Sequence, residues 1–235
     1  MQNGHACQRL IVALDVPNAA AAHKIVAAVG DSATTYKVGM QLFTAEGPDL
    51  VRNLVATGRR VFLDLKYHDI PNTVAAAVRS AATLGVHMLT VHAAGGSKML
   101  RAAVKAGRES NPELKILAVT VLTSLDDEEL RATGVREQAG EQVLRLARLA
   151  LEAGCQGIVA SAHEAKELRR QLGPAFLIIT PGVRPAGAAV EDQARVATPA
   201  DAIAAGATHI VVGRPITGAE DPAVAARAIL EEIAS

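Results

Sequence analysis

The stretch VFLDLKYHDIPNT, residues 61–73, holds the pattern on which the fold prediction depends. An apolar run, Val61–Leu65, leads into charged residues and a short polar loop, and an Ala-rich segment of helical period follows. An apolar run of this length bounded by turn residues is typical of a buried strand, and the segment after it is typical of an amphipathic helix. The stretch is therefore interpreted as the start of one strand–loop–helix unit.

The same unit recurs along the whole chain. Apolar runs predict strands at Leu10–Leu14, Tyr36–Val38, Val61–Leu65, Val86–Val91, Lys115–Val121, Gly157–Ala160, Phe176–Thr180 and His209–Val212. Helical periodicity predicts helices at Ala19–Val29, Pro48–Thr57, Thr73–Leu84, Met99–Glu109, Glu137–Ala153, Glu164–Leu172, Pro199–Ala205 and Pro222–Ile233. Units of this kind, repeated through 235 residues, match the usual length of one (β/α)8 barrel. We therefore expect a closed parallel TIM barrel that forms a single domain over residues 1–235.

Local sequence signals support several of these helix starts. Ser161 is followed three residues later by Glu164, which is the spacing of a capping box. Thr198 and Asp221 each precede a proline, so that a capping side chain comes directly before a first-turn Pro. These three helices are expected to begin at those residues.

An open, doubly wound sheet is the alternative architecture. Its dinucleotide-binding members carry a GxGxxG turn after the first strand. In this chain the corresponding turn is Asp15-Val16-Pro17-Asn18, which lacks that pattern. A closed barrel also leaves no strand edge exposed. The sequence therefore favours the barrel and argues against a nicotinamide cofactor.

Composition excludes several classes of partner. The 24 basic residues balance 24 acidic ones, so the chain has no overall field that would attract nucleic acid or an anionic membrane surface. Cys7 and Cys155 lie far apart and form no metal-binding or disulfide pattern. The apolar run near the N-terminus is too short for a signal peptide or a membrane span. A cytoplasmic protein is expected.

Charged residues follow the first three predicted strands, where barrels of this fold carry their functional groups. Asp15 ends the first strand, Lys37 lies on the second, and Asp64 and Lys66 close the third. Because side chains alternate along a strand, Asp64 and Lys66 should share the face that points to the barrel mouth. Carboxylates beside the lysines favour their charged form, so an imine-forming lysine is the weaker interpretation. The alternating charges instead indicate proton donation or charge stabilisation.

Two loops near the C-terminus predict a site for a phosphate group. The seventh strand is followed by Pro181 to Arg184, and the eighth by Gly213 and Arg214. Loops at these two positions often bind phosphate in this fold, and arginine can form bidentate bonds to it. The long loop of residues 181–195 is suited to closing over a ligand, and its Gln193 could reach that ligand.

The remaining polar candidates allow more than one interpretation. Thr123 and Ser124 follow the fifth strand and could bind a ring or a carbonyl group, although Ser124 could equally cap the next, acidic helix. His92 ends the fourth strand, where a structural role is the better interpretation. No histidine or carboxylate spacing indicates a metal site.

Seven motifs in order connect the chain to a known family. They are ALDV at 13–16, YKVG at 36–39, DLKYHDIPNT at 64–73, VHAAGG at 91–96, LTS at 122–124, PGVRP at 181–185 and VGRPI at 212–216. Together they span nearly the full length, and the chain resembles the orotidine 5′-phosphate decarboxylases. The DxKxxD part alone is less specific, because related phosphosugar enzymes share it.

The resemblance implies a reaction and a set of residue roles. The reaction is the conversion of orotidine 5′-phosphate to uridine 5′-phosphate and CO₂, without metal or organic cofactor. Lys66 would protonate C6 of the pyrimidine, and Asp64 would lie beside the departing carboxylate. Asp69 and Thr73 would reach across a homodimer interface into the neighbouring site. The substrate-binding residues implied are Asp15, Lys37, Asp64, Thr73, Thr123 or Ser124, Pro181, Arg184, Gln193, Gly213 and Arg214, with Lys37 and Asp69 also part of the catalytic charge network.

Two other functions remain open from the sequence. One is a magnesium-dependent phosphosugar decarboxylase or aldolase of the same barrel group. The other is a barrel that binds nucleoside phosphates without turnover, which a missing or neutralised Lys66 would have indicated.

Overall fold

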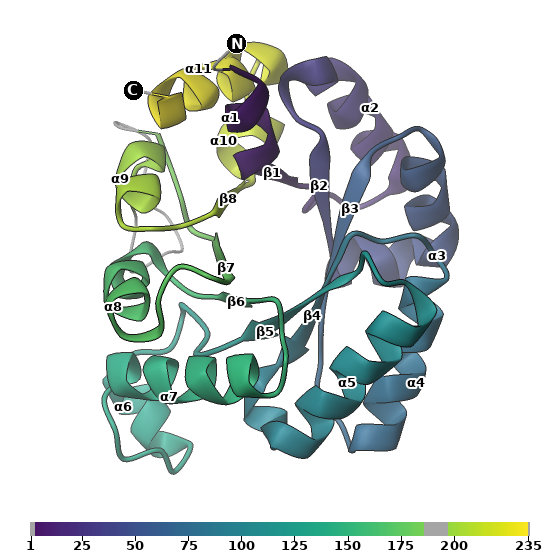
Figure 1. Ribbon diagram of the computed structural model, residues 1–235. Helices are drawn as coiled ribbons and strands as arrows, with labels where there is room; N and C mark the ends of the chain where they lie inside the picture. The colour runs from purple at the N-terminus through teal and green to yellow at the C-terminus, as the bar shows by residue number, and fades with distance from the viewer. Residues whose placement is uncertain (1–2, 186–196, 235) are drawn as a thin grey trace.

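A computed structural model describes residues 3–185 and 197–234 of the chain. Within these residues, β1 to β8 follow one another around a closed parallel barrel, in which β8 pairs with β1 (Figure 1). The strands are β1 (Leu10–Ala13), β2 (Thr35–Gly39), β3 (Arg60–Tyr67), β4 (Met88–His92), β5 (Lys115–Val119), β6 (Gly157–Val159), β7 (Leu177–Thr180) and β8 (His209–Val212). The predicted (β/α)8 barrel is confirmed.

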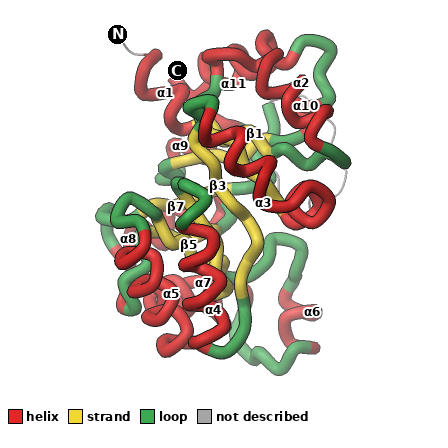
Figure 2. Tube along the Cα trace, turned by 90° about the vertical axis from the view of Figure 1, so that its right-hand side faces the viewer, coloured by secondary structure: helices red, strands yellow, loops and turns green. Residues whose placement is uncertain are grey.

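Helices surround the barrel as an outer ring (Figure 1). They are α1 (Asn3–Arg9), α2 (Ala19–Val29), α3 (Met40–Ala56), α4 (Pro71–Ala82), α5 (Gly96–Ser110), α6 (Asp127–Ala132), α7 (Ala139–Glu152), α8 (Ala162–Leu172), α9 (Pro199–Ala204), α10 (Arg214–Thr217) and α11 (Pro222–Ala234). Short 3₁₀ turns occupy Gly30–Ser32 and Ala93–Gly95. Figure 2 shows the short α6 set apart from the ring, and α1 beside α11.

The strands separate two apolar cores. Alternate residues point inward, so that Ile11 and Ala13 of β1 belong to the inner core while Leu10 and Val12 pack against the helices. The inner core consists of Ile11, Ala13, Phe62, Met88, Leu117, Ile179 and Val211. This packed interior closes the barrel below its mouth, so a ligand can enter only the upper end.

The expected helix starts are confirmed. Ser161 and Glu164 form the capping box of α8, and the Thr198 side chain accepts a hydrogen bond from the Asp201 N–H at the start of α9. The Asp221 carboxylate accepts from the N–H groups of Ala223 and Val224 at the start of α11. These side chains satisfy amide groups that the first helical turn leaves unpaired.

Four local features differ from the predictions, and one of them is α10, a short helix that begins at Arg214 where a loop was predicted. The helix predicted from Pro48 is present as the second part of α3, but a helical segment that was not predicted precedes it from Met40, and the two parts meet at Gly47, where φ is 68° and the backbone is not helical. No helix was predicted for α1, whose Arg9 side chain donates to the carbonyls of Ala207 and Thr208. The suggestion that Ser124 caps the acidic helix is wrong, because the Asp126 carboxylate accepts from the first amides of α6.

Candidate functional site

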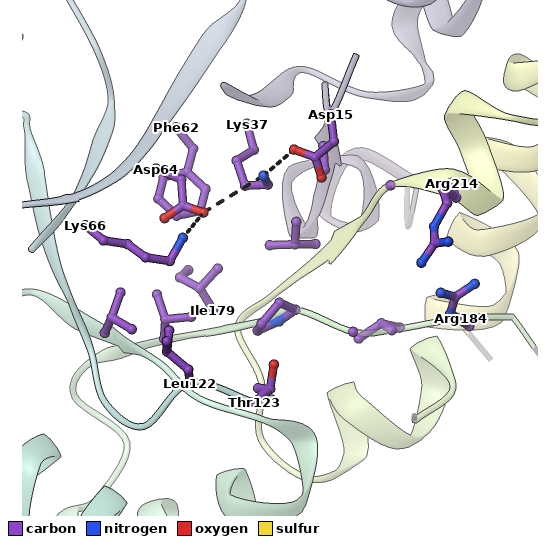
Figure 3. Close-up of a pocket in the computed structure, with 18 of the residues that line it drawn as sticks. Asp15, Lys37, Phe62, Asp64, Lys66, Leu122, Thr123, Ile179, Arg184 and Arg214 are labelled. Carbon is purple, nitrogen blue, oxygen red and sulfur yellow. Dashed lines mark hydrogen bonds and ion pairs between the residues drawn. The ribbon is translucent and has the colours of Figure 1, made fainter. Parts of the chain in front are cut away.

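A pocket of about 460 Å³ opens at the carboxyl ends of the strands (Figure 3). Its lining residues come from β1 to β3 and from β5 to β8, with the loops that follow them. Of the predicted site residues, it contains Asp15, Lys37, Asp64, Lys66, Thr123, Pro181, Arg184, Gly213 and Arg214. Of these predicted residues, Asp15 is the first in the sequence and Arg214 the last, and they are 199 positions apart. Their meeting in one cavity is what a closed barrel requires.

Four charged side chains of alternating sign form a chain along one wall of the pocket. Lys37 Nζ lies 2.8 Å from Asp15 Oδ1 and 3.9 Å from Asp64 Oδ2. Lys66 Nζ lies 2.9 Å from the same Asp64 Oδ2. Lys37 and Asp64 are only 12% and 14% exposed, so water screens their attraction weakly. We refer to Asp15, Lys37, Asp64 and Lys66 as the charged chain.

Glycine at position 39 makes room for one of these ion pairs. A Cβ atom at Gly39 would lie 3.2 Å from Lys37 Nζ and 3.3 Å from Asp15 Oδ1. Any larger residue would therefore crowd the Lys37–Asp15 pair. The YKVG motif thus supplies both the lysine and the space that its ammonium group occupies.

An irregularity in the sheet shapes the position of Lys66. Leu63 pairs with Leu89 but Tyr67 pairs with Val91, so β3 has two more residues than β4 between these pairs. Lys66 lies in this bulge with φ 51°, and it is the only non-glycine residue with a positive φ within the described ranges. Strain of this kind in a residue with a Cβ atom often marks a functional position.

The floor of the pocket is apolar. Phe62, Val159, Ile179 and Val211 line it from the barrel interior, and Leu122 lines it from the loop after β5. Figure 3 shows Leu122 and Ile179 across the cavity from Lys66 and Asp64. An apolar floor beside a charged wall can hold the face of a ring while polar groups contact its edge.

Two arginines occupy the other end of the pocket. Figure 3 shows Arg184 and Arg214 far from Lys66, with their guanidinium groups turned toward each other. Arg184 is 9% exposed, and its backbone N–H donates to the Ala197 carbonyl. Two neighbouring guanidinium groups in a pocket favour a doubly charged anion between them. A Cβ atom at Gly213 would lie 3.5 Å from Ala13 Cβ and 3.8 Å from Asp15 Oδ2, so glycine leaves this space in the pocket free.

Some predicted site residues lie elsewhere or outside the described ranges. Ser124 is exposed and does not line the pocket, whereas Thr123 does. Asp69 and Thr73 are exposed on the loop and helix start after β3, away from this chain's own pocket. Gln193, with most of the loop of residues 181–195, lies outside the described residues. The pocket places the other predicted residues along its lining, and all of the predicted ligand contacts, including these four, stay predictions.

His92 has the surroundings of a structural histidine. Its Nδ1 accepts a hydrogen bond from the Ala94 N–H, and its ring stacks on His68 with centroids 5.2 Å apart. Burial lowers the pKa of His92, and the nearby His68 and Lys66 lower it further. A neutral ring that accepts a backbone hydrogen bond fits the interpretation made from the sequence.

Two further observations apply to the described part of the chain. Within residues 3–185 and 197–234, no three histidine, cysteine or carboxylate side chains gather closely enough to hold a metal ion. Among the helices in those ranges, none has the length and apolar character needed to cross a bilayer.

One residue that was not predicted from the sequence is hydrogen-bonded to two members of the charged chain. The hydroxyl group of Thr90, on β4, donates to Asp64 Oδ1 and accepts from the Lys66 backbone N–H, at 2.9 Å in both cases. No sequence pattern marks Thr90 as a site residue, because it lies within an apolar run and threonine is common in strands.

The fold and the pocket define the class of protein. It is a (β/α)8 barrel with a charged pocket at the carboxyl ends of its strands, where enzymes of this fold carry their active sites. A family model described as "Orotidine 5′-phosphate decarboxylase / HUMPS family" matches residues 8–229. The chain belongs to this family.

Individual relatives agree with the family model. The chain is 54% identical over 235 aligned positions to the orotidine 5′-phosphate decarboxylase of Moorella thermoacetica, covering 97% of this chain and 93% of the relative. It is 57% identical to that of Anaeromyxobacter dehalogenans, covering 94% and 96%. The crystal structure of the Lactobacillus acidophilus orotidine 5′-phosphate decarboxylase has a TM-score of 0.88 at 42% identity, covering 97% of this chain and 100% of the other.

Proposed function

We propose that this protein converts orotidine 5′-phosphate to uridine 5′-phosphate and CO₂, the last step of de novo pyrimidine synthesis, in the cytoplasm and without a metal or organic cofactor. The family and the names of its relatives support the reaction. The observation that carries the mechanism is the charged chain, which lies at one end of a pocket whose other end holds two arginines. This layout fits a ligand with a reacting ring at one end and a phosphate at the other.

The substrate would lie along the length of the pocket. Arg184, Arg214 and the backbone at Gly213 would hold the phosphate, together with Gln193. Asp15 and Lys37 would bind the ribose, since they lie between the arginines and Lys66 in Figure 3. The pyrimidine would rest on the apolar floor, with Pro181 and Thr123 beside it. C6 and its carboxylate would then point to Asp64 and Lys66.

The chemical step follows from that placement. The bond between C6 and the carboxylate breaks, the electron pair stays on C6, and CO₂ leaves. A fixed ammonium group about 4 Å from this carbanion stabilises it by roughly 4 kcal/mol at an effective dielectric constant of about 20. Lys66 then transfers a proton from Nζ to C6, and the amine recovers a proton from solvent. Asp64 holds Lys66 in position and would repel the substrate carboxylate.

No separate electrophile is needed for this route, because Lys66 supplies both the positive charge and the proton. This is the reason to expect turnover after removal of divalent metals. A magnesium-dependent phosphosugar decarboxylase would instead use an oxygen-liganded ion to stabilise an enediolate.

We also propose that the active protein is a homodimer in which Asp69 and Thr73 act in the partner's site. Both side chains are exposed and outside this chain's own pocket. Ile70, next to Asp69, is 66% exposed, and Met40 at the start of α3 is 55% exposed. Large apolar side chains beside the mouth are suited to an interface with a second copy. Asp69 of one subunit would then lie beside the charged chain of the other subunit and add one more carboxylate to it.

The proposal is tested by offering protein treated with EDTA three candidate substrates: orotidine 5′-phosphate, a keto-gulonate phosphate and a hexulose phosphate. Each is assayed with and without added Mg²⁺. We expect turnover of orotidine 5′-phosphate alone, at the same rate in both conditions. Turnover of a phosphosugar that depends on Mg²⁺ would establish the alternative enzyme class, and tight nucleotide binding without turnover would establish a binding protein.

A further inference from the structure

We propose that Thr90 is a positioning residue of the active site, whose hydroxyl group holds both the Asp64 carboxylate and the Lys66 backbone in the arrangement that the reaction uses. The inference rests on the proposed function, because it assigns Thr90 a role in the same proton transfer. Thr90 does not line the pocket, so its effect would pass through Asp64 and Lys66 rather than through the substrate.

The Thr90 hydroxyl donates one hydrogen bond and accepts another, both with residues of the charged chain. Thr90 is completely buried on β4, between Leu89 and Val91 of the outer core. Its Oγ1 donates to Asp64 Oδ1 and accepts from the Lys66 N–H, at 2.9 Å each. A hydroxyl has one proton to donate, so the donor is used on the carboxylate while the amide occupies an acceptor position.

The first consequence concerns the orientation of Asp64. Thr90 occupies Oδ1, which leaves Oδ2 to face Lys66 at 2.9 Å and Lys37 at 3.9 Å. The terminal torsion of an aspartate is broad and would by itself permit rotation of the carboxylate plane. The hydrogen bond from Thr90 therefore restricts this rotation, and it holds one carboxylate oxygen facing the two ammonium groups.

The second consequence concerns the backbone of Lys66. Its φ of 51° lies in the left-handed region, which is unfavourable for a residue with a Cβ atom. The bulge between the Leu63–Leu89 and Tyr67–Val91 pairs removes Lys66 from the regular ladder of hydrogen bonds. A buried N–H without an acceptor is costly, and Thr90 Oγ1 provides that acceptor. One side chain thus stabilises the bulge that directs Lys66 into the pocket.

The test compares substitutions that differ in the hydroxyl group alone. Thr90→Val keeps the shape of the side chain but removes the hydroxyl, whereas Thr90→Ser keeps the hydroxyl. Thr90→Ala and Thr90→Ser form a second pair that differs by one oxygen atom and stays informative if the valine variant does not fold. Thr180→Val is the matched control, because Thr180 is also fully buried on a barrel strand and its Oγ1 has no hydrogen-bond partner within the described residues.

Two readouts are measured for each variant. In steady-state decarboxylation of orotidine 5′-phosphate, we expect Thr90→Val to lower kcat by about 10- to 100-fold, the usual size of one lost hydrogen bond to a charged group, with KM changed less than about threefold. Thr90→Ser should stay within about threefold of the wild type, and Thr180→Val within about twofold. In protein labelled with ¹⁵N-lysine, hydrogen exchange at the Lys66 amide should accelerate at least about 10-fold in Thr90→Val and Thr90→Ala only.

The outcomes separate this inference from the proposed function. If the wild type is active and Thr90→Val matches Thr180→Val in kcat, the role of Thr90 is wrong while the function stands. Equal loss of kcat in Thr90→Ser and Thr90→Ala would also overturn it, since the hydroxyl would then be unimportant. If the wild type does not decarboxylate orotidine 5′-phosphate, the proposed function fails, and the catalytic part of this inference fails with it. The exchange rate at Lys66 then still shows whether Thr90 holds that backbone.

Discussion

Replacement of Lys66 by alanine should abolish nearly all decarboxylation while leaving the barrel folded. The ammonium group contributes roughly 4 kcal/mol of carbanion stabilisation at about 4 Å and an effective dielectric constant of about 20, which corresponds to about 10³-fold in rate. Loss of a positioned proton donor removes a further factor of about 10²–10⁴. We therefore expect Lys66→Ala to lower kcat/KM by at least about 10⁵-fold.

The structure explains why this variant should fold. The Lys66 side chain is 28% exposed, and its backbone hydrogen bond to Thr90 does not involve the ammonium group. Alanine retains the Cβ atom at φ 51°, so the backbone strain of the bulge is unchanged, as it would not be with glycine. Asp64 keeps its hydrogen bond from Thr90 and the nearby Lys37.

The assay follows pyrimidine absorbance and released CO₂, with calorimetric binding of uridine 5′-phosphate as the check on an intact pocket. Lys98→Ala is the control, because Lys98 is an exposed lysine on α5 outside the pocket. A Lys66→Ala protein that binds the nucleotide normally and retains more than about 1% of wild-type kcat/KM would refute the role of Lys66 as proton donor.

Three further predictions follow from the same geometry. Arg214→Ala should raise KM and also lower kcat, because phosphate binding would help to drive the pocket closed around the reacting ring, and unchanged kinetics would show that Arg214 does not hold the phosphate. Equal amounts of Lys66→Ala and Asp69→Ala chains, inactive alone, should recover about a quarter of wild-type activity after exchange of subunits, since half of the dimers then carry one intact site; no recovery would mean that Asp69 does not act across an interface. Burial lowers the pKa of His209 to about 4 from 6.5, and Arg9, among other cations, adds to the shift. Between pH 6.5 and pH 4 the His209 side chain therefore binds more protons in the unfolded chain than in the folded one. His209 does not lower the free energy of unfolding above pH 6.5, and it lowers it by up to roughly 3 kcal/mol as the pH falls toward 4. Urea titrations of His209→Gln should show a smaller fall, and an identical fall would exclude His209 as its source.

The barrel and most of the pocket could be predicted because they depend on strong local patterns. Apolar runs such as Val61–Leu65 mark strands, and the charges after them have to meet at one end of a closed barrel. The ion pairs of Lys66 with Asp64, and of Lys37 with Asp15, follow from that placement.

The features that could not be predicted depend on contacts distant in the sequence or on backbone detail. Thr90 lies 26 positions from Asp64, and only the pairing of β3 with β4 brings their side chains together. The left-handed backbone of Lys66 carries no glycine or asparagine signal. Thr123 and Ser124 were equivalent in the sequence, and the path of the loop after β5 places only Thr123 in the pocket.

The most direct test of the proposed mechanism is the stoichiometry of the reaction catalysed by metal-depleted protein. Purified protein is treated with EDTA, supplied with orotidine 5′-phosphate in D₂O, and analysed for CO₂ and for the product by NMR. The proposed mechanism predicts one CO₂ for each uridine 5′-phosphate formed, with deuterium at C6 of the product, because the ammonium protons of Lys66 exchange with solvent. Folded protein that releases no CO₂ until a divalent metal is restored would contradict it.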